Sequence, residues 1–381
     1  MVNWKYVKIG DVCTVERGGS PRPIDKFITD DPNGINWIKI GDTDDSMYIT
    51  KTAQKIIPEG MKKSRYVQPG DFLLSNSMSF GRPYILKIDG CIHDGWLVLR
   101  DNNGIFDKRF LYYYLSSPST YQKFKNMAVG GVVNNLNSEM VRGVTVPVPT
   151  MEEQLNIVSA LDKVTELIAL RKEQLAKLDQ LVKSRFIELF GSVEDNRFGI
   201  KTVKIKDACE LINGKAFKPE DWSDKGLPIV RIQNLNNEQA PFNYFEGEIK
   251  EQYLIDTGEL LFSWSGTPGT SFGAFFWNRG KAVLNQHIFR VKPKLKFNLF
   301  FLQFALNGRI DFIISKAHGG VGLQHITKKE LDEVELLLPS VEQQNQFAAF
   351  VEQTDKSKLA IQASLDKLEL LKKSLMQQYF G

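Results

Sequence analysis

An apolar seam with heptad spacing occurs twice in this chain, and it constrains the fold more than any other feature. The first copy, within 151–191, reads as one long helix whose apolar series only Arg171 and Arg185 interrupt. Such a seam needs a partner helix. The second copy, within 341–381, supplies one in register, offset by 190 residues (341 − 151), and both copies end in Phe-Gly. The positions expected to pair are Ile157, Leu161, Val164, Ile168, Leu175, Leu178, Val182 and Leu189 with Phe347, Val351, Ile361, Leu365, Leu368, Leu375 and Tyr379.

A globular segment precedes each seam, and it too is repeated. The motif Val-Lys-Ile-x-Asp-x-Cys opens both copies and ends at Cys13 and Cys209, which read as small core residues. Short β-rich runs bounded by Gly and Pro predict strands at 34–40 and 69–75, matched by 226–232 and 257–263, and helices follow at 110–115 and 299–304. The offset between copies drifts in these segments but stays constant along the helices. Helix length is therefore the conserved quantity of the repeat.

These patterns predict an α+β chain with an internal pseudo-two-fold repeat. Two mixed α/β domains at 1–150 and 192–340 are separated by helices at 151–191 and 341–381, which form an antiparallel coiled coil. A helix of this size is roughly 60 Å long, comparable to about 17 base pairs of DNA. Two DNA-binding domains held at a fixed separation suit the two halves of a split site on duplex DNA. A spacer between two protein-binding domains has the same geometry.

Composition narrows the class further. The net charge is only +4, with 42% hydrophobic and 25% charged residues, so nucleic-acid binding is permitted but not demonstrated. We expect a cytoplasmic protein without a membrane segment, because long apolar runs and a signal-peptide pattern are missing. The three cysteines have no Cys-x-x-Cys spacing and the four histidines no metal-ligand spacing, so no metal site is expected.

Catalytic motifs are also missing. The segment 266–270 is glycine-rich but lacks the lysine of a phosphate-binding loop. Glu248-Ile249-Lys250 resembles a nuclease tripeptide, but such tripeptides arise by chance. The methyltransferase tetrapeptide Asn/Asp-Pro-Pro-aromatic does not occur. We therefore predict a chain that is not an enzyme and holds no cofactor of its own.

Three polar loops in each copy could read DNA. Base readout needs exposed side chains with hydrogen-bond donors and acceptors, supported by phosphate contacts, although most polar loop residues are only solvated turns. The candidates in the first copy are Arg17, Ser20, Arg22, Asn76, Ser77, Ser79, Arg82, Asn134, Asn135 and Asn137. Those in the second are Asn213, Lys215, Lys218, Trp264, Ser265, Thr267, Thr270, Gln324, His325 and Thr327. The aromatic runs 112–114 and 300–301 are expected to pack in cores rather than stack on single-stranded DNA.

A family resemblance rests on the order and duplication of these motifs. The run from Gly130-Gly131 through Pro149-Thr150-Met151-Glu152-Glu153-Gln154 recurs from Gly319-Gly320 through Pro339-Ser340-Val341-Glu342-Gln343-Gln344. With the Gly-Asp-Phe-Leu-Leu-Ser strand and the Leu/Lys-rich helices, the chain resembles the specificity (S) subunit of type I restriction–modification systems over essentially its whole length.

The resemblance implies two target-recognition domains, each reading one half of a bipartite asymmetric sequence in double-stranded DNA. The helices would fix the gap and dock two modification (methyltransferase) subunits, and restriction (translocase/nuclease) subunits would join that core. S-adenosylmethionine, ATP and Mg are implied for those partners only. A coiled-coil scaffold that binds protein partners without reading DNA is the alternative.

Overall fold

The computed structural model describes residues 4–76, 80–128, 135–237, 239–266, 272–320 and 323–381. The chain divides into two compact units, one made of residues 1–172 and 363–381 and the other of residues 173–362. Each unit therefore contains one globular part together with one half of each long helix. Among the described residues, no helix is both long and apolar enough to span a membrane.

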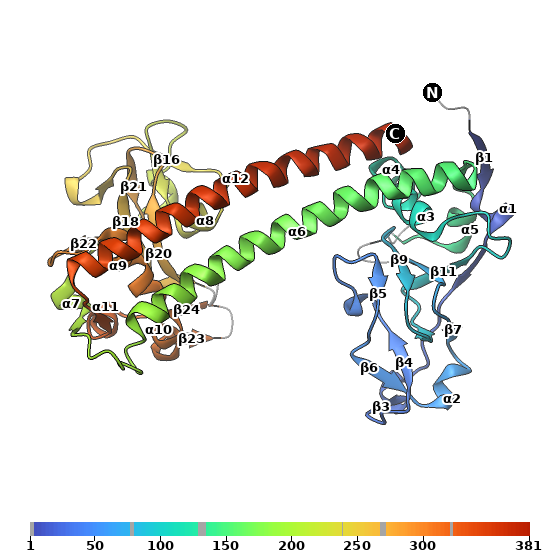
Figure 1. The fold of residues 1–381 in the computed structure, drawn as a ribbon, viewed down its shortest axis with the longest axis horizontal. Helices are drawn as coiled ribbons and strands as arrows, with labels where there is room; N and C mark the ends of the chain where they lie inside the picture. Colours follow the sequence, from blue (N-terminus) through green and yellow to red (C-terminus); the bar gives the residue numbers. More distant parts are fainter. Residues whose placement is uncertain (1–3, 77–79, 129–134, 238, 267–271, 321–322) are drawn as a thin grey trace. The chain divides into compact units, whose positions relative to one another are not determined.

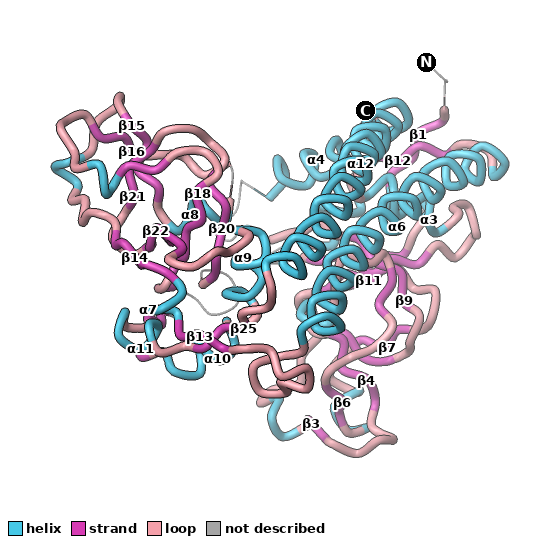
Figure 2. The backbone as a smooth tube through the Cα atoms, turned by 60° about the vertical axis from the view of Figure 1, so that its left-hand side comes forward, coloured by secondary structure: helices cyan, strands magenta, loops and turns pink. Residues whose placement is uncertain are grey.

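The two long helices are present as predicted. Helix α6 runs from Met151 to Phe190 and α12 from Val341 to Phe380. They pack antiparallel, as Figure 2 shows for the cyan tubes, and ion pairs link them within each unit. Lys172 pairs with Glu369 at 3.1 Å in the first unit, and Asp179 pairs with Lys358 at 2.7 Å in the second. Numbers rise along one helix as they fall along the other, as an antiparallel pair requires.

All fifteen expected seam positions are buried or half-buried, whereas the flanking Leu167, Leu170 and Leu181 are exposed. Arg171 and Arg185, which interrupt the apolar series, are half-buried.

Both helices begin in the same way. Thr150 N donates to Glu153 Oε2 at 2.8 Å, and Ser340 N donates to Gln343 Oε1 at 3.1 Å. These reciprocal caps satisfy backbone groups that the first turn of a helix leaves unpaired.

The first unit has two layers of sheet beneath its helices (Figure 1). Helices α3 (Lys108–Leu115), α4 (Pro118–Ala128) and α5 (Ser138–Arg142) lie on the side of α6 and α12. The middle sheet has the order β2 (Thr14–Arg17), β11 (Trp96–Arg100), β8 (Phe72–Ser75), β9 (Pro83–Leu86), β5 (Tyr48–Ile49). The outer sheet has the order β3 (Ile28–Thr29), β6 (Gln54–Ile56), β4 (Ile35–Ile38), β10 (Gly90–Ile92), β7 (Arg65–Val67). Strand β1 (Lys5–Lys8) pairs with β12 (Thr145–Val148), and the short helices are α1 (Ile9–Val12) and α2 (Pro58–Met61).

Side chains of the middle sheet alternate between two cores, as the period of a strand dictates. Leu74 and Leu97 pack toward the helices, in one core with Phe110 and Phe380. Leu73 and Val98 pack in a second core with the outer sheet. Because both faces of the middle sheet are buried, its strands appear in the sequence as short, nearly continuous apolar runs.

The second unit repeats this pattern with four strands in each of its two main sheets. One sheet has the order β14 (Cys209–Asn213), β22 (Ile288–Pro293), β18 (Glu259–Ser263), β20 (Gly273–Trp277), and the other β16 (Asn243–Phe245), β15 (Leu227–Val230), β21 (Ala282–Leu284), β17 (Leu254–Ile255). The parallel pair β4·β10 has its counterpart in the parallel pair β15·β21. Strand β13 (Thr202–Lys204) pairs with β25 (Glu335–Leu337). A small third sheet has the order β19 (Ser265–Gly266), β24 (Leu323–His325), β23 (His318–Gly320). The helices of this globular part are α7 (Ile205–Ala208), α8 (Ile232–Asn236), α9 (Leu299–Asn307), α10 (Ile310–Lys316) and α11 (Lys328–Asp332).

A buried glutamine in the first turn of each long helix forms hydrogen bonds with the globular part that precedes it. Gln154, 1% exposed, accepts from Asp107 N at 2.8 Å and donates to Pro149 O at 3.1 Å. Gln344 makes the same two contacts, with Asn298 N at 2.9 Å and Pro339 O at 3.0 Å. These contacts give the Glu-x-Gln and Gln-Gln motifs of the two helix starts a structural role.

The aromatic runs lie in the cores, in a pairing that differs from the expected one. The side chains of Asp107 and Asn298 cap α3 and α9, so Phe110 corresponds to Phe301. The expected alignment of Phe110 with Leu299 was wrong by two residues. The capping residues occupy equivalent positions in the two helices, and the aromatic runs begin at different positions after them. Phe110 packs against Phe380 at 5.6 Å, and Phe301 packs against Phe190 at 5.1 Å, measured between ring centroids. The Phe-Gly ends of both long helices are thus anchored in equivalent cores.

Candidate nucleic-acid interface

The predicted loops meet in each unit, and the backbone holds them in the same way. Gly18 N donates to Trp96 O at 2.9 Å, Asn76 N to Gly95 O at 2.9 Å, and Leu136 N to Asn76 O at 2.9 Å. These three bonds gather segments 17–22, 76 and 135–137 around the turn 93–95, between β10 and β11, and a bond from Gly81 N to Ser75 O at 2.7 Å adds 80–82. We call this set the first loop cluster.

The second unit forms an equivalent cluster. Gly214 N donates to Ile288 O at 3.2 Å, Trp264 N to His287 O at 3.3 Å, and Ile326 N to Trp264 O at 3.2 Å. Strand pairing fixes the equivalence, since Ser75 opposes Trp96 on β11 and Ser263 opposes Ile288 on β22. The second loop cluster therefore comprises 213–218, 264–266, 285–287 and 325–327.

A glycine allows the close approach in both clusters. A Cβ added at Gly18 would lie 2.2 Å from His93 O, and one added at Gly214 would lie 2.2 Å from Asn285 O. Any side chain at these positions would push the first loop away from the turn. The paired glycines thus have a packing reason that the sequence pattern alone did not reveal.

The turns 93–95 and 285–287 were missed by the sequence reasoning. They contribute His93, Asp94, Asn285, Gln286 and His287, all half-buried. His93 and His287 do lie in equivalent turns, but two places apart when the strands are aligned, so a search for matched positions could not find them. Burial lowers the pKa of both imidazoles below the usual value, which leaves the rings neutral at pH 7.

Several candidates of the first cluster surround Asp94. Arg17 Nε donates to Asp94 O at 3.0 Å, and Ser20 Oγ donates to Asp94 Oδ1 at 2.8 Å. Arg22, whose side chain is 82% exposed, pairs with Asp94 Oδ2 at 3.4 Å. Asn76 is only 1% exposed and donates from Nδ2 to Asp94 O at 2.8 Å, so it supports the turn from below.

Candidates of the second cluster have other partners. The ammonium of Lys215 lies over the rings of Phe217 and Phe245, at 4.9 and 4.4 Å, and 3.8 Å from Asp221. Lys218 and Asn213 are exposed, and Ser265 is buried. The half-buried Trp264 ring stacks on Phe289 at 5.8 Å.

The loops that follow the double glycines end in helix caps. Asn137 Oδ1 accepts from Met140 N at 2.8 Å, and Thr327 Oγ1 accepts from Glu330 N at 3.3 Å. Both side-chain oxygens are therefore used in starting α5 and α11. Asn135, half-buried, and His325, exposed, precede the caps at equivalent positions. Ser77, Ser79, Asn134, Thr267 and Thr270 lie outside the described residues, as does the side chain of Gln324.

Arg82 is exposed and lies beside a hollow of about 510 Å³ in the first unit. Phe80 and Tyr121 stack there at 5.9 Å, and Asp45 and Tyr112 also line it. Its rim thus combines aromatic rings with both signs of charge, close to the post-strand loop.

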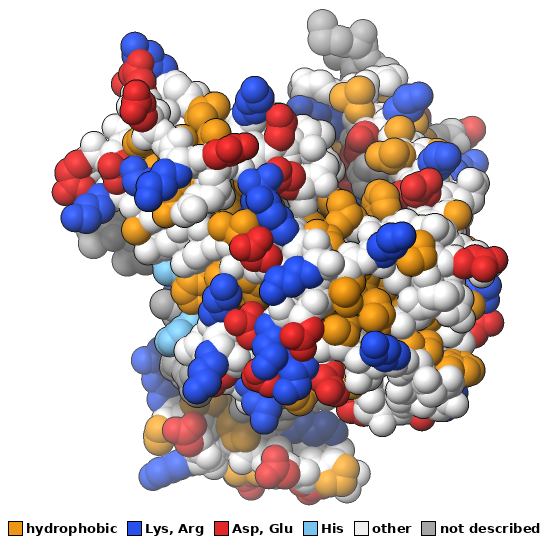
Figure 3. Space-filling view, turned by 90° about the vertical axis from the view of Figure 1, so that its left-hand side faces the viewer, with side chains coloured by type: hydrophobic (Ala, Val, Ile, Leu, Met, Phe, Trp, Pro, Cys, Tyr) orange, Lys and Arg blue, Asp and Glu red, His pale blue; other side chains and the backbone are white. Residues whose placement is uncertain are grey.

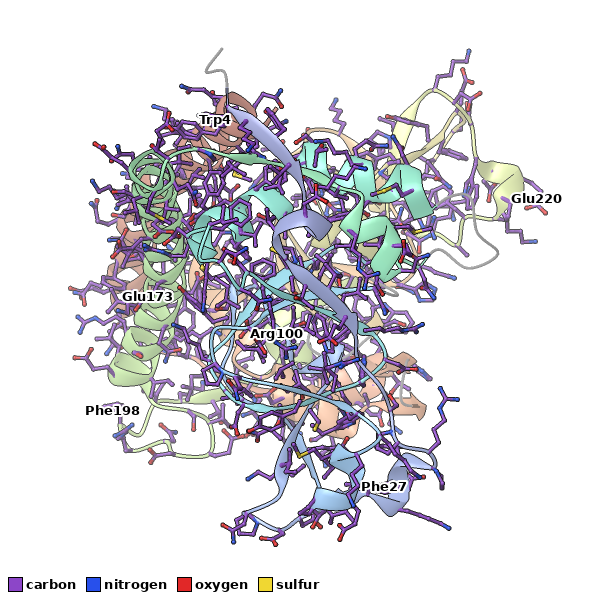
Figure 4. The ribbon with its side chains drawn as sticks, turned by 90° about the vertical axis from the view of Figure 1, so that its right-hand side faces the viewer. Trp4, Phe27, Arg100, Glu173, Phe198 and Glu220 are labelled. Carbon is purple, nitrogen blue, oxygen red and sulfur yellow. The ribbon has the colours of Figure 1, made fainter. Side chains whose placement is uncertain are left out.

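Other arginines are engaged within the fold. Arg100, labelled in Figure 4, bridges Asp71 and Glu16 at 2.9 Å each. Arg65 pairs with the same Glu16 at 2.8 Å.

On the face drawn in Figure 3, Lys and Arg side chains lie among Asp and Glu rather than forming one continuous basic patch. Within the described part of the chain, no group of three or more His, Cys, Asp or Glu could hold a metal ion.

Comparison with known proteins identifies the class that this geometry belongs to. The family model "Type I restriction modification DNA specificity domain" matches residues 1–180 and 199–370. The chain therefore belongs to the family of type I restriction–modification DNA specificity proteins.

Individual relatives are distant in sequence but extensive in coverage. The putative type I restriction enzyme MjaX specificity subunit of Methanocaldococcus jannaschii is 24% identical, over 98% of this chain and 92% of its own length. The MjaVIII specificity subunit of the same organism is 23% identical over 61% of this chain, which spans only 55% of that relative. A chain from a solved type I R-M system, described for its complex assembly and conformational transition, has a TM-score of 0.61 at 18% identity, covering 100% of this chain and 98% of its own. The last likeness shows the fold alone.

Proposed function

We propose that each globular part reads one half of a bipartite, asymmetric DNA sequence, and that the paired helices fix the gap between the halves. In this proposal 1–150 and 192–340 are target-recognition domains, and 151–191 and 341–381 are spacer helices that also dock two modification subunits. Restriction subunits complete the complex. S-adenosylmethionine, ATP and Mg serve those partner subunits, while this chain supplies sequence recognition and no bond-making step.

One observation carries the proposal. The two loop clusters share one backbone frame, including the paired Gly18 and Gly214, but carry different hydrogen-bonding side chains on it. Arg17, Asn76 and Asp94 are replaced by Asn213, Trp264 and Gln286. A shared frame with different hydrogen-bonding groups is what two readers of unlike sequences require, because base edges are distinguished by donor and acceptor pattern.

The charge of the clusters supports duplex binding of moderate strength. Exposed Arg82 in the first cluster and Lys218 in the second are available to phosphates. The limited excess of positive charge fits a subunit that binds DNA within a larger complex rather than alone.

The test is a methylation map. The chain is co-expressed with its modification subunit in cells free of other adenine methylation, and methylated adenines are mapped by long-read sequencing. We expect one bipartite motif with a fixed gap, present only when both proteins are made. Methylation without a bipartite motif, or the same methylation in cells that lack this chain, would contradict the proposal.

A further inference from the structure

The turn residue Asp94 is the polar centre of the first loop cluster. Its backbone N donates to Ser20 Oγ at 3.2 Å, and the same hydroxyl donates to Asp94 Oδ1 at 2.8 Å. Its carbonyl oxygen accepts from Arg17 Nε and Asn76 Nδ2, and Oδ2 pairs with Arg22 Nη2. Every polar atom of this residue is thus bound by a side chain from a loop that we predicted to read DNA.

A carboxylate at a DNA-binding surface needs an explanation, because phosphates repel it. The Ser20 hydrogen bond, aided by the positive charge of Arg17, holds the pKa of Asp94 below its usual range, so it is ionised at neutral pH. It therefore acts either on a base directly or on the cations beside it. The geometry favours the second role, since both carboxylate oxygens already have partners.

The second unit serves as an internal comparison for a purely structural role. Its equivalent turn carries Gln286, whose Nε2 lies 3.2 Å from His287 Nε2. The positions of Arg17, Ser20 and Arg22 are taken there by Asn213, Ala216 and Lys218. The same backbone frame forms without the carboxylate or any of its partners, so the fold does not require Asp94.

The contacts with residue 94 leave N–H groups suited to guanine on both arginines. Arg17 Nε donates to the backbone carbonyl of Asp94, and Arg22 Nη2 donates to its carboxylate. The remaining N–H groups of each fork can donate to O6 and N7 of guanine. A guanidinium fixed by a neighbouring acceptor loses less side-chain entropy on binding than a free one. Its fork is presented in one orientation, which sharpens selection of the base.

We propose that Asp94 is a positioning residue for specificity: its carboxylate orients Arg22, while its backbone carbonyl holds Arg17 alongside, so that the first unit selects a G·C pair in its half-site. This inference rests on the proposed function and adds the chemical class of the base. Asp94 itself touches no base in this scheme.

The experiment uses the chain assembled with its modification subunit and the duplex motif given by the methylation map. Dissociation constants are measured at one salt concentration for that duplex and for duplexes with single base-pair changes. We expect Asp94→Asn, which keeps the shape but removes the charge, to reduce discrimination at one G·C pair by about tenfold. Arg22→Lys, which keeps charge but loses the planar fork, should relax the same pair. The other half-site and the gap should not change.

The matched control is Asp89→Asn, the same substitution before the opposite end of β10, where Tyr66 donates to the carboxylate. It should leave discrimination at every position intact. Thermal unfolding of each variant checks the fold, and if Asp94→Asn does not assemble, Arg22→Lys carries the same prediction.

Three results would overturn the inference while leaving the proposed function standing. The half-site of the first unit could contain no G·C pair, Asp94→Asn could weaken all duplexes equally, or its relaxed position could differ from that of Arg22→Lys. The last result would indicate that Asp94 reads a base itself. A wild-type map without any bipartite motif would instead reject the proposed function.

Discussion

A chain in which the first sequence repeat, residues 5–191, replaces the second, residues 201–381, should recognise an inverted-repeat DNA sequence. The construction is residues 1–200 followed directly by 5–191, which retains the natural connection between the first helix and the second domain. If each unit reads its own half-site, the methylation map should show one half of the natural motif twice, in opposite orientations. The asymmetric natural motif should disappear.

The packing of the helices makes this exchange reasonable. Five of the eight seam positions of α6 have an apolar counterpart 190 residues later on α12, as with Leu175 and Leu365. Val182 corresponds to the half-buried Lys372, whose pKa burial lowers, so the exchange also removes a desolvated charge. The reciprocal chain, built from two copies of 201–381 joined through 192–200, should give the other half twice. Retention of the asymmetric motif by either chain would contradict separate reading.

Lengthening both helices by one heptad should lengthen the gap and leave both half-sites unchanged. The insertions belong between Lys172 and Glu173 and between Gln362 and Ala363, where the two compact units divide and where the offset of 190 (362 − 172) is kept. Seven residues add about 10 Å of helix, on the order of three base pairs along the duplex. A heptad also keeps the apolar seam in phase.

The control is a heptad of the same sequence inserted at the exposed turn 102–104, which should leave the gap as it is. An insertion in only one helix should disrupt the pair and abolish methylation. A changed half-site with an unchanged gap would show that the helices do not set the distance.

The long helices could be predicted almost to the residue because their signals are local. Heptad spacing, a Pro before the start and a repeated Phe-Gly end all lie within each segment. The bounds differ from the expected 151–191 and 341–381 only at Gly191 and Gly381. The loops that converge could also be predicted, because polar residues occur at matching places in both copies of the sequence repeat.

The rest of the site depends on strand order, which no local pattern encodes. The turn 93–95 joins the cluster because β11 lies between β2 and β8. Side-chain partners such as Asp221 for Lys215 likewise arise only once loops fold together. The cap at Thr327 was within reach of the sequence, since Thr-x-x-Glu at 327–330 is a capping box.

The central claim is that the two loop clusters contact different halves of one target, and tethered cleavage tests it most directly. A DNA-cleaving iron chelate is attached to a cysteine placed at Arg22 or at Lys218, which are exposed at equivalent positions of the first loops. The native Cys13, Cys91 and Cys209 are buried, and burial raises their thiol pKa, to about 12 for Cys13 and Cys209, so they compete little for labelling.

The labelled chain is assembled with its modification subunit on the mapped duplex, and strand breaks are located by sequencing. The account predicts breaks centred on one half-site for the label at 22 and on the other half-site for the label at 218. Breaks from both labels in the same half-site, or breaks spread evenly along the duplex, would contradict it.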